Sequence, residues 1–375
     1  MKQEISPRIK LLSILILGVV FFGLFEVVSF LLLDIYPNLS YDKNMITQDY
    51  ETYLSLRNNS LGWDKAIDDF GNSRNLPNRV FVQDTTIQID LYGDSFTEGG
   101  EVENDSLIWS NVISKELKLI VNNKGVGGYG SDQSYLKFKL NPNPHKIVVL
   151  SHLTENIIRN VNQFRHLIYP SEIFDFKPRF IVDSDSLKLI KIPTIALDKV
   201  NDFKKNPNIY LDHEYFKLGK ETGIFAKEFP YTLTLLKSIA FNWKIRAAFG
   251  FYSGYQPFYE EGHKSQGVAV TKKIIEKFVI ESKSKKLIPI ATIIPTSRDF
   301  EFYEEHGYFP YKSLVDSLND SIPLIDFGKE IQLKLDNRKT NYIDIYVAPG
   351  RHMNEKGHML LSEIFVDYFN KNITL

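Results

Sequence analysis

The pattern of apolar and polar positions separates one unbroken apolar run near the N-terminus from a long region in which short apolar runs alternate with amphipathic segments. The unbroken run extends from Leu11 to Leu33, LLSILILGVVFFGLFEVVSFLLL, with Glu26 as its single charged residue. As a helix it would be about 34 Å long, enough to cross a hydrocarbon layer of ~30 Å. We therefore predict one N-terminal transmembrane helix over residues 11–33, in contact with the lipid bilayer. Glu26 lies at membrane depth, which indicates either a functional group or, more simply, a protonated carboxyl or one that faces a partner helix.

A cleaved signal peptide is the competing interpretation of this run. Its apolar part would span about 7–15 residues and end at a small-residue cleavage site, whereas this run is longer and continues into DIYPN. The retained anchor is therefore favoured. Basic residues precede the run and Asp34 follows it, so the positive-inside bias predicts a cytoplasmic stub over residues 1–10 and places residues 34–375 in the periplasm or exterior. The basic residues on the N-terminal flank are Lys2, Arg8 and Lys10.

Residues 34–83 are polar without a sustained period, and we interpret them as a membrane-proximal segment. Beyond them, apolar runs typical of strands alternate with helix-like spacing. Strands are predicted at Thr86–Tyr92, Leu119–Val121 and Lys146–Ser151, and helices over Asp105–Leu117 and Asp132–Lys139. This alternation implies right-handed strand–helix–strand units and a parallel sheet.

The alternation stops between about 165 and 265, which we interpret as an insertion. Within it, Arg179–Val182 and Leu187–Ile192 flank a turn-rich DSDS and predict a hairpin. The α/β pattern then resumes, with helices near 269–281 and 355–368 and strands near 287–294 and 323–325. We predict one domain over residues 84–375, a three-layer α/β/α sandwich with a mainly parallel, flavodoxin-like sheet. Its central strands should be those near 86–92, 146–151 and 287–294.

Composition excludes several classes of function. The 45 basic and 46 acidic side chains nearly cancel, so the chain lacks the electrostatic footprint of a nucleic-acid-binding protein. Cysteine is absent, which excludes disulfides, thiolate nucleophiles and cysteine-based metal sites.

A serine follows the first predicted strand, in the run YGDSFTEG over residues 92–99. Ligands of open α/β sheets bind at the carboxyl ends of the strands, so Ser95 is placed as a nucleophile, if a base and an oxyanion-binding set of donors are near. The three-residue string GDS is short, and a simple strand-to-helix turn with a capping serine also explains it.

Two further loops follow predicted strands. The run NKGVGGYG over residues 123–130 offers backbone N–H groups to an anion. It fits G-x-G-x-x-G, but it follows the second strand and no acidic residue ends a strand about 20 residues later, so we expect no dinucleotide cofactor. After the third strand, Asn156 in the run TEN has an amide that suits an oxyanion hole.

A histidine precedes the last predicted helix, in GRHMNEKGH over residues 350–358. His352, in a loop at a helix start, is well placed as a general base. His352 and His358 invite interpretation as a metal pair, but no carboxylate–histidine cluster accompanies them. We expect no metal and a structural or surface role for His358.

These four segments resemble the blocks of the SGNH (GDSL-like) hydrolase superfamily in order and position, over roughly residues 84–160 and 285–370. Ser95 matches the nucleophile, Gly128 the second-block glycine, Asn156 the third-block asparagine and His352 the final-block histidine. The resemblance implies that Ser95 attacks an acyl carbonyl and that His352 acts as base and then acid. It also implies that the Ser95 N–H, the Gly128 N–H and the Asn156 amide hold the oxyanion.

One position departs from the family pattern. The acid normally lies three residues before the histidine, where this chain has Pro349. Proline cannot orient an imidazole by a charge-assisted hydrogen bond. In order of preference, a backbone carbonyl orients His352, or Asp344 substitutes as the third member, or activity is lost.

The resemblance implies a membrane-anchored serine esterase or O-acyltransferase that acts on O-acyl groups, foremost O-acetyl groups, of an extracytoplasmic glycan, without a cofactor. A lipid ester is another substrate class. The alternative function is a catalytically silent glycan-binding or assembly module that partners a membrane acyltransferase, because fold does not imply function. Hydrolysis or transfer, the acyl group, the oligomeric state and any protein partner stay open at this stage.

Overall fold

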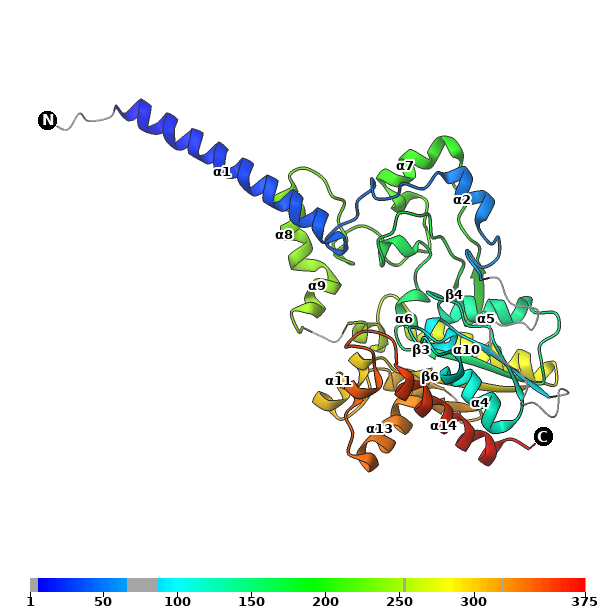
Figure 1. Ribbon diagram of the computed structural model, residues 1–375. Helices are drawn as coiled ribbons and strands as arrows, with labels where there is room; N and C mark the ends of the chain where they lie inside the picture. The colour runs from blue at the N-terminus through cyan, green and yellow to red at the C-terminus, as the bar shows by residue number, and fades with distance from the viewer. Residues whose placement is uncertain (1–5, 66–86, 252–253, 319, 375) are drawn as a thin grey trace. The chain divides into compact units, whose positions relative to one another are not determined.

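The computed structural model describes residues 6–65, 87–251, 254–318 and 320–374 (Figure 1). Its strands are β1 Gln88–Tyr92, β2 Ile120–Asn123, β3 Ile147–Leu153, β4 Arg179–Asp183, β5 Ser186–Ile190, β6 Ile288–Ile294 and β7 Leu324–Asp326. Its α-helices are α1 Pro7–Ile35, α2 Tyr50–Leu56, α3 Ser95–Glu98, α4 Trp109–Leu117, α5 Ser131–Leu140, α6 Asn156–Arg159, α7 Val200–Lys205, α8 Tyr231–Phe241, α9 Trp243–Ala248, α10 Gly267–Ser284, α11 Ser297–His306, α12 Lys312–Ser317, α13 Phe327–Arg338 and α14 Glu355–Asn372.

The main sheet is parallel, and its strand order in the described residues is β2-β1-β3-β6-β7. In chain order these strands are 2-1-3-4-5, the doubly wound flavodoxin-like order. The strands predicted to be central, β1, β3 and β6, are central. All seven residues of β3 are buried, as expected for a strand covered on both faces.

Helices cover both faces of this sheet, which confirms the predicted three layers (Figure 1). On one face, α5 and α10 pack on β1, β3 and β6 through a shared apolar core that includes Phe138, Val148 and Phe278. On the other, α4, α13 and α14 pack together, with the ring of Trp109 edge-on to those of Phe327 and Phe365.

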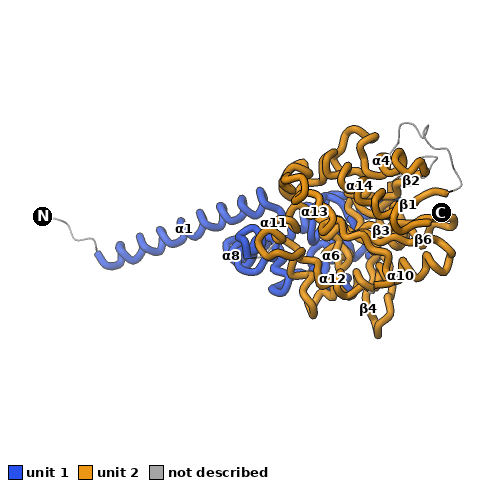
Figure 2. Tube along the Cα trace, turned by 90° about the horizontal axis from the view of Figure 1, so that it is seen from below, with its two compact units in different colours: residues 1–55, 164–175, 195–251 blue, residues 56–163, 176–194, 252–375 orange. Residues whose placement is uncertain are grey.

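The chain forms two compact units, coloured separately in Figure 2. Unit 2 comprises residues 56–163, 176–194 and 252–375 and holds the parallel sheet. It also includes the antiparallel hairpin β4–β5, which confirms the predicted hairpin. Unit 1 comprises residues 1–55, 164–175 and 195–251, so the stretch predicted as an insertion contributes to both units.

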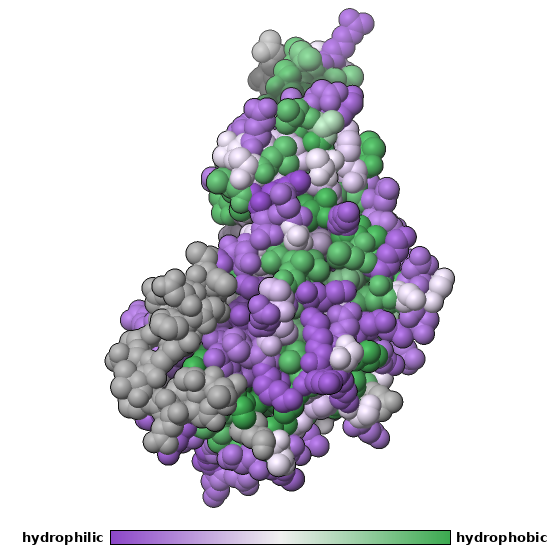
Figure 3. All heavy atoms as spheres, turned by 90° about the vertical axis from the view of Figure 1, so that its right-hand side faces the viewer, coloured by the Kyte–Doolittle hydropathy of each residue, from purple (hydrophilic) through white to green (hydrophobic). Residues whose placement is uncertain are grey.

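Helix α1 contains the predicted transmembrane run and is long and apolar enough to cross a membrane. Most of its side chains are exposed, whereas Glu26, Ser29 and Leu33 are buried within unit 1. By contrast, the face in Figure 3 mixes hydrophilic residues with small hydrophobic patches, as is usual for a protein surface in water. Residues 1–5 of the predicted stub, residues 66–83 of the predicted membrane-proximal segment and Thr86 lie outside the described residues.

Candidate active site

Ser95 is the first residue of α3, directly beyond the carboxyl end of β1. The Asp94 side chain caps this turn, accepting the Phe96 N–H at 2.9 Å. The strand order reverses between β1 and β3, so Ser95 lies at the topological switch point where ligands of such sheets bind. Gly125 in the glycine-rich loop packs on this turn, because a Cβ there would lie 2.5 Å from the Glu98 nitrogen.

His352 approaches Ser95 from a loop 257 positions further along the chain. The loop is closed by backbone hydrogen bonds from Val347 to His352 and from Asn354 to Ile345, and the Asn354 side chain then caps α14. Within unit 2, His352 Nε2 lies 2.8 Å from Ser95 Oγ. The predicted proximity of these two side chains is confirmed.

The second imidazole nitrogen of His352 faces Glu101. The Nδ1–Oε1 distance is 2.9 Å, and Arg351 donates from Nε and Nη2 to the two oxygens of the same carboxylate, each at 2.9 Å. The Arg351 guanidinium, and then the His352 imidazole, lower the pKa of Glu101, so this carboxylate stays charged at neutral pH. A carboxylate at Nδ1 keeps the proton on that nitrogen and leaves Nε2 free to accept the Ser95 hydroxyl proton.

The predicted partners of Nδ1 were therefore wrong, since neither Asp344 nor a backbone carbonyl occupies that position. Asp344 is exposed in the short 3-10 turn Tyr342–Ile345, and its side chain lines a hollow of about 580 Å³ beside α13 and α14. Its backbone carbonyl accepts a hydrogen bond from Asn354. The predicted acid, Asp344, lies close to His352 in the sequence, whereas Glu101 lies six residues after Ser95, in the run GDSFTEGGE.

The His352 ring is also held by packing. It lies 5.0 Å from the Phe96 ring, centroid to centroid. Gly100 also packs against His352, because an added Cβ there would lie 2.9 Å from His352 Cβ and Cγ. Gly100 has a φ of +53° and therefore also supplies a conformation that favours glycine.

Asn156 begins α6, at the carboxyl end of β3, and is fully buried. Its Oδ1 accepts a hydrogen bond from Arg159 Nη1 at 3.1 Å, which fixes the orientation of the amide. Its Nδ2 is buried and has no hydrogen-bond partner among the described residues. Buried donors are rarely left without a partner, so this N–H is available to an anionic oxygen of a ligand.

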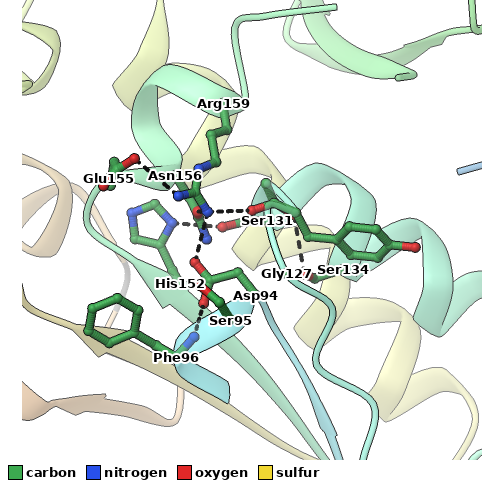
Figure 4. A network of polar contacts seen from close by, with 12 residues as sticks. Asp94, Ser95, Phe96, Gly127, Ser131, Ser134, His152, Glu155, Asn156 and Arg159 are labelled. Carbon is green, nitrogen blue, oxygen red and sulfur yellow. Dashed lines mark hydrogen bonds and ion pairs between the residues drawn. The ribbon is translucent and has the colours of Figure 1, made fainter. Parts of the chain in front are cut away.

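Arg159 links Asn156 to the turn that bears Ser95 (Figure 4). It donates to Asp94 Oδ2 at 3.1 Å, to the Tyr129 carbonyl at 3.0 Å and to Glu155 Oε1 at 3.0 Å. Burial alone lowers the pKa of Arg159, but the carboxylates of Glu155 and Asp94 raise it overall. Burial raises the pKa of Asp94, and Arg159 partly offsets this effect.

Gly128 belongs to the partly exposed end of the glycine-rich loop and has a φ of +79°. Among the described residues, no acceptor takes its N–H. The Ser95 N–H is at the first position of α3 and so has no partner within that helix.

His358 lies inside α14. It is buried, and its Nδ1 accepts the Trp109 N–H at 3.2 Å. The contact joins α14 to α4 and supports the structural role predicted for His358.

The sequence matches no protein-family model and no curated protein. Solved structures similar to this chain include a member of the lipolytic protein G-D-S-L family from Veillonella parvula DSM 2008, with 12% identity and a TM-score of 0.32 over 76% of this chain and 99% of that one. A two-domain esterase active on acetylated mannans has 10% identity and a TM-score of 0.33 over 76% of this chain and 48% of that one. An acetyl xylan esterase from the rumen bacterium Butyrivibrio proteoclasticus has 11% identity and a TM-score of 0.31, over 80% of this chain and 65% of that one. At TM-scores this low, none of these likenesses indicates what this chain does.

Proposed function

We propose that the protein is an SGNH-type serine esterase or O-acyltransferase that acts on O-acyl groups, foremost O-acetyl groups, of an extracytoplasmic glycan. The observation that carries the proposal is the chain of contacts from Ser95 Oγ to His352 Nε2 and from His352 Nδ1 to Glu101. It has the geometry of a nucleophile, a base and an orienting acid. Pro349 was the main argument for a silent binding module, and Glu101 removes it by supplying the acid from another loop.

In the first half-reaction, His352 Nε2 takes the Ser95 hydroxyl proton as Oγ bonds to the acyl carbon. The carbonyl oxygen becomes an oxyanion that accepts hydrogen bonds from Asn156 Nδ2 and from the N–H groups of Ser95 and Gly128. The ester C–O bond then breaks, and His352 returns the proton to the departing sugar oxygen. An acyl group on Ser95 and a free sugar hydroxyl result.

In the second half-reaction, water or another hydroxyl attacks the acyl-enzyme and gives its proton to His352. Ser95 leaves with that proton, and the product is a carboxylic acid or a new ester. The site is partly open, because Ser95, Gly128 and His352 are all partly exposed. Such a site suits a short acyl group on a large polar polymer, which supports glycan as the substrate class.

We also propose that α1 is a retained membrane anchor, with residues 34–375 outside the cytoplasm. The basic N-terminal flank supports this orientation, and the burial of Glu26, Ser29 and Leu33 within unit 1 supports retention, because cleavage after α1 would remove part of that packing. A C-terminal reporter fusion tests the orientation. Activity of a reporter that works only in the cytoplasm would refute it.

The catalytic proposal is tested by acetate release from an O-acetylated polysaccharide, with and without an unacetylated oligosaccharide as acceptor. We expect acetate, or acetylated oligosaccharide by mass spectrometry, from the full chain and none from Ser95→Ala. Release of acyl groups from a lysophospholipid but not from the glycan would contradict the substrate class and leave the esterase chemistry intact. A folded protein that acts on neither substrate would overturn the enzyme proposal.

A further inference from the structure

Helix α8, in unit 1, has the reverse of the pattern expected for a helix on a water-exposed surface. Its buried residues are the small polar Thr234 and Ser238, whereas Leu233, Leu236 and Ile239 are exposed. One charged residue, Lys237, is exposed with them, and its ammonium lies over the Phe225 ring. A water-soluble amphipathic helix buries its apolar stripe and exposes its polar one. Small polar residues at the helix contact, with apolar residues outside, are typical of helices packed within a membrane.

The side of α8 that is covered packs against α1 (Figures 1 and 2). The hydroxyls of Ser29 and Thr232 lie 3.1 Å apart, and the Phe30 and Tyr231 rings pack edge-on at 5.1 Å. Beyond the C-terminal end of α8, the Asn242 side chain donates to the Asn38 carbonyl. Residues further along α1 and just beyond it contact residues further along α8 and just beyond it, so the two helices run in the same direction.

Glu26 gives the pairing a specific polar contact. Its carboxylate oxygens accept the backbone N–H groups of Tyr231, at 2.5 Å, and Thr232, at 3.2 Å. These are the first two N–H groups of α8, which have no partner within the helix. An N–H group without a hydrogen-bond partner is unfavourable in hydrocarbon, and so is a carboxylate without a partner. Because the Glu26 carboxylate accepts these N–H groups, neither is left without a partner. The charged residue in the apolar run thus faces a helix of its own chain.

The register also sets the depth of α8. Glu26 lies seven positions before Leu33, about 10 Å along the helix axis from the end of the apolar run. The Phe229 ring, just before α8, packs edge-on to Phe22, deeper still, at a centroid distance of 6.2 Å. If α1 spans a bilayer, the first turns of α8 are therefore at the level of its acyl chains.

We propose that α8 is a second membrane element, which enters the outer half of the bilayer beside α1 and returns without crossing it. The inference rests on the proposed membrane anchoring of α1, and it commits to lipid acyl chains as the occupant of the exposed face of α8. Continuity with α1 supports this occupant, because the exposed side chains of both helices lie at the same depth. Exposed rings lie at the last residue of α8, Phe241, and beyond the helix at Phe249 and Phe251, with Arg246 over the Phe251 ring. This mixture of aromatic and basic groups suits the headgroup region.

Single-cysteine spin labels on the full chain in phosphatidylcholine–phosphatidylglycerol liposomes test the proposal, since the natural chain has no cysteine. The variants are Leu236→Cys on α8, Val20→Cys on α1 and Leu197→Cys elsewhere in unit 1. Leu197 is a matched control, with an exposure of 55% against 58% for Leu236. We expect the labels at 236 and 20 to collide with oxygen and to be shielded from a water-soluble nickel chelate. The label at 197 should show the opposite preference.

The other outcomes separate the two proposals. A label at 236 open to the nickel chelate, with 20 in lipid, overturns the α8 proposal and leaves the anchor. If the nickel chelate reaches the labels at 236 and at 20, both the α8 proposal and the anchor proposal are overturned. A label at 236 shielded from both reagents means that protein, such as a second copy of the chain, covers α8, and this also overturns the proposal.

A second pair of variants tests the Glu26 contact with the label kept at position 236. Glu26→Ala removes both acceptors and should increase collisions of this label with the nickel chelate. Glu26→Gln keeps one oxygen acceptor and should change them less. An unchanged label in Glu26→Ala would contradict the role given to Glu26.

Discussion

Two arginine–carboxylate groups flank Ser95, and they differ in their exposure to water. On one side, Arg159 holds Asp94 and Asn156 in the interior, with side-chain exposures of 10% for Arg159 and 1% for Asp94. On the other, Arg351 holds Glu101 at the surface, with exposures of 61% and 28%. In the proposed mechanism, the buried group positions the donor for the oxyanion, and the exposed group orients the base. Loss of the arginine should thus lower stability strongly on the buried side and only slightly on the exposed side.

The largest difference should appear on removal of the arginines. Arg159→Ala leaves Asp94 buried without its partner, so we expect the free energy of unfolding to fall by roughly 3–5 kcal/mol. Arg351→Ala should lower it by less than about 1 kcal/mol, because exposed pairs contribute little. Urea denaturation followed by tryptophan fluorescence measures both, with Arg159→Lys as the variant that keeps the charge. Equal losses for the two alanine variants would contradict the predicted difference between the buried and the exposed pair.

On the buried side, the Asn156 amide should act on turnover. Asn156→Ala removes one oxyanion donor, and we expect kcat to fall by about 10²–10³. Asn160→Ala is a matched control, because Asn160 is equally buried and donates to Thr271 at 2.8 Å instead of facing the site. It should lower stability and spare kcat. A similar kcat loss in both variants would mean that Asn156 acts through the fold alone.

On the exposed side, Glu101→Gln should slow turnover with little change in stability. Loss of a buried triad acid costs about 10⁴ in kcat. We expect a smaller loss, of about 10- to 10³-fold, since water reaches Glu101 and can partly replace it. Steady-state kinetics with an acetyl ester measure this effect, and Glu103→Gln in the same loop is the control. Full activity in Glu101→Gln would return the carbonyl-supported dyad to consideration.

The sheet and the positions of three candidate site residues in it could be predicted from the sequence, because apolar runs mark buried strands and these residues stand at strand ends or helix starts. The predominantly apolar runs at β1, β3 and β6 predicted a parallel sheet with these strands in its centre. Ser95, Asn156 and His352 could be located because each follows a strand or precedes a helix. The contact between Glu101 and His352 could not be predicted, because it depends on how the loop after α3 folds toward a residue that is distant in the sequence. The exposed apolar face of α8 was missed for another reason, since its composition alone resembles that of a buried helix.

The smallest predicted effect on kcat is that of removing Arg351 from the exposed arginine–carboxylate group. Arg351→Ala should lower kcat only a few-fold, since Glu101 still faces His352 when the guanidinium is removed. The pKa of Glu101 should rise toward its ordinary value, because Arg351 is the main group that lowers it. Glu101 would still be charged at neutral pH, and its support of His352 would be lost at a less acidic pH than in the natural chain.

Asp344→Asn is the matching negative control and should leave kcat unchanged. Steady-state kinetics at neutral pH measure both variants. A large loss in Asp344→Asn would contradict the assignment of Glu101 as the acid.

The central claim is that Ser95 is an activated nucleophile, and covalent labelling tests it most directly. The full chain is treated with a fluorophosphonate probe and its intact mass is measured, followed by peptide mapping. We predict one adduct, on Ser95, that is lost in Ser95→Ala and strongly slowed in His352→Ala. A folded natural chain that acquires no adduct, or acquires it on another residue, would contradict the account.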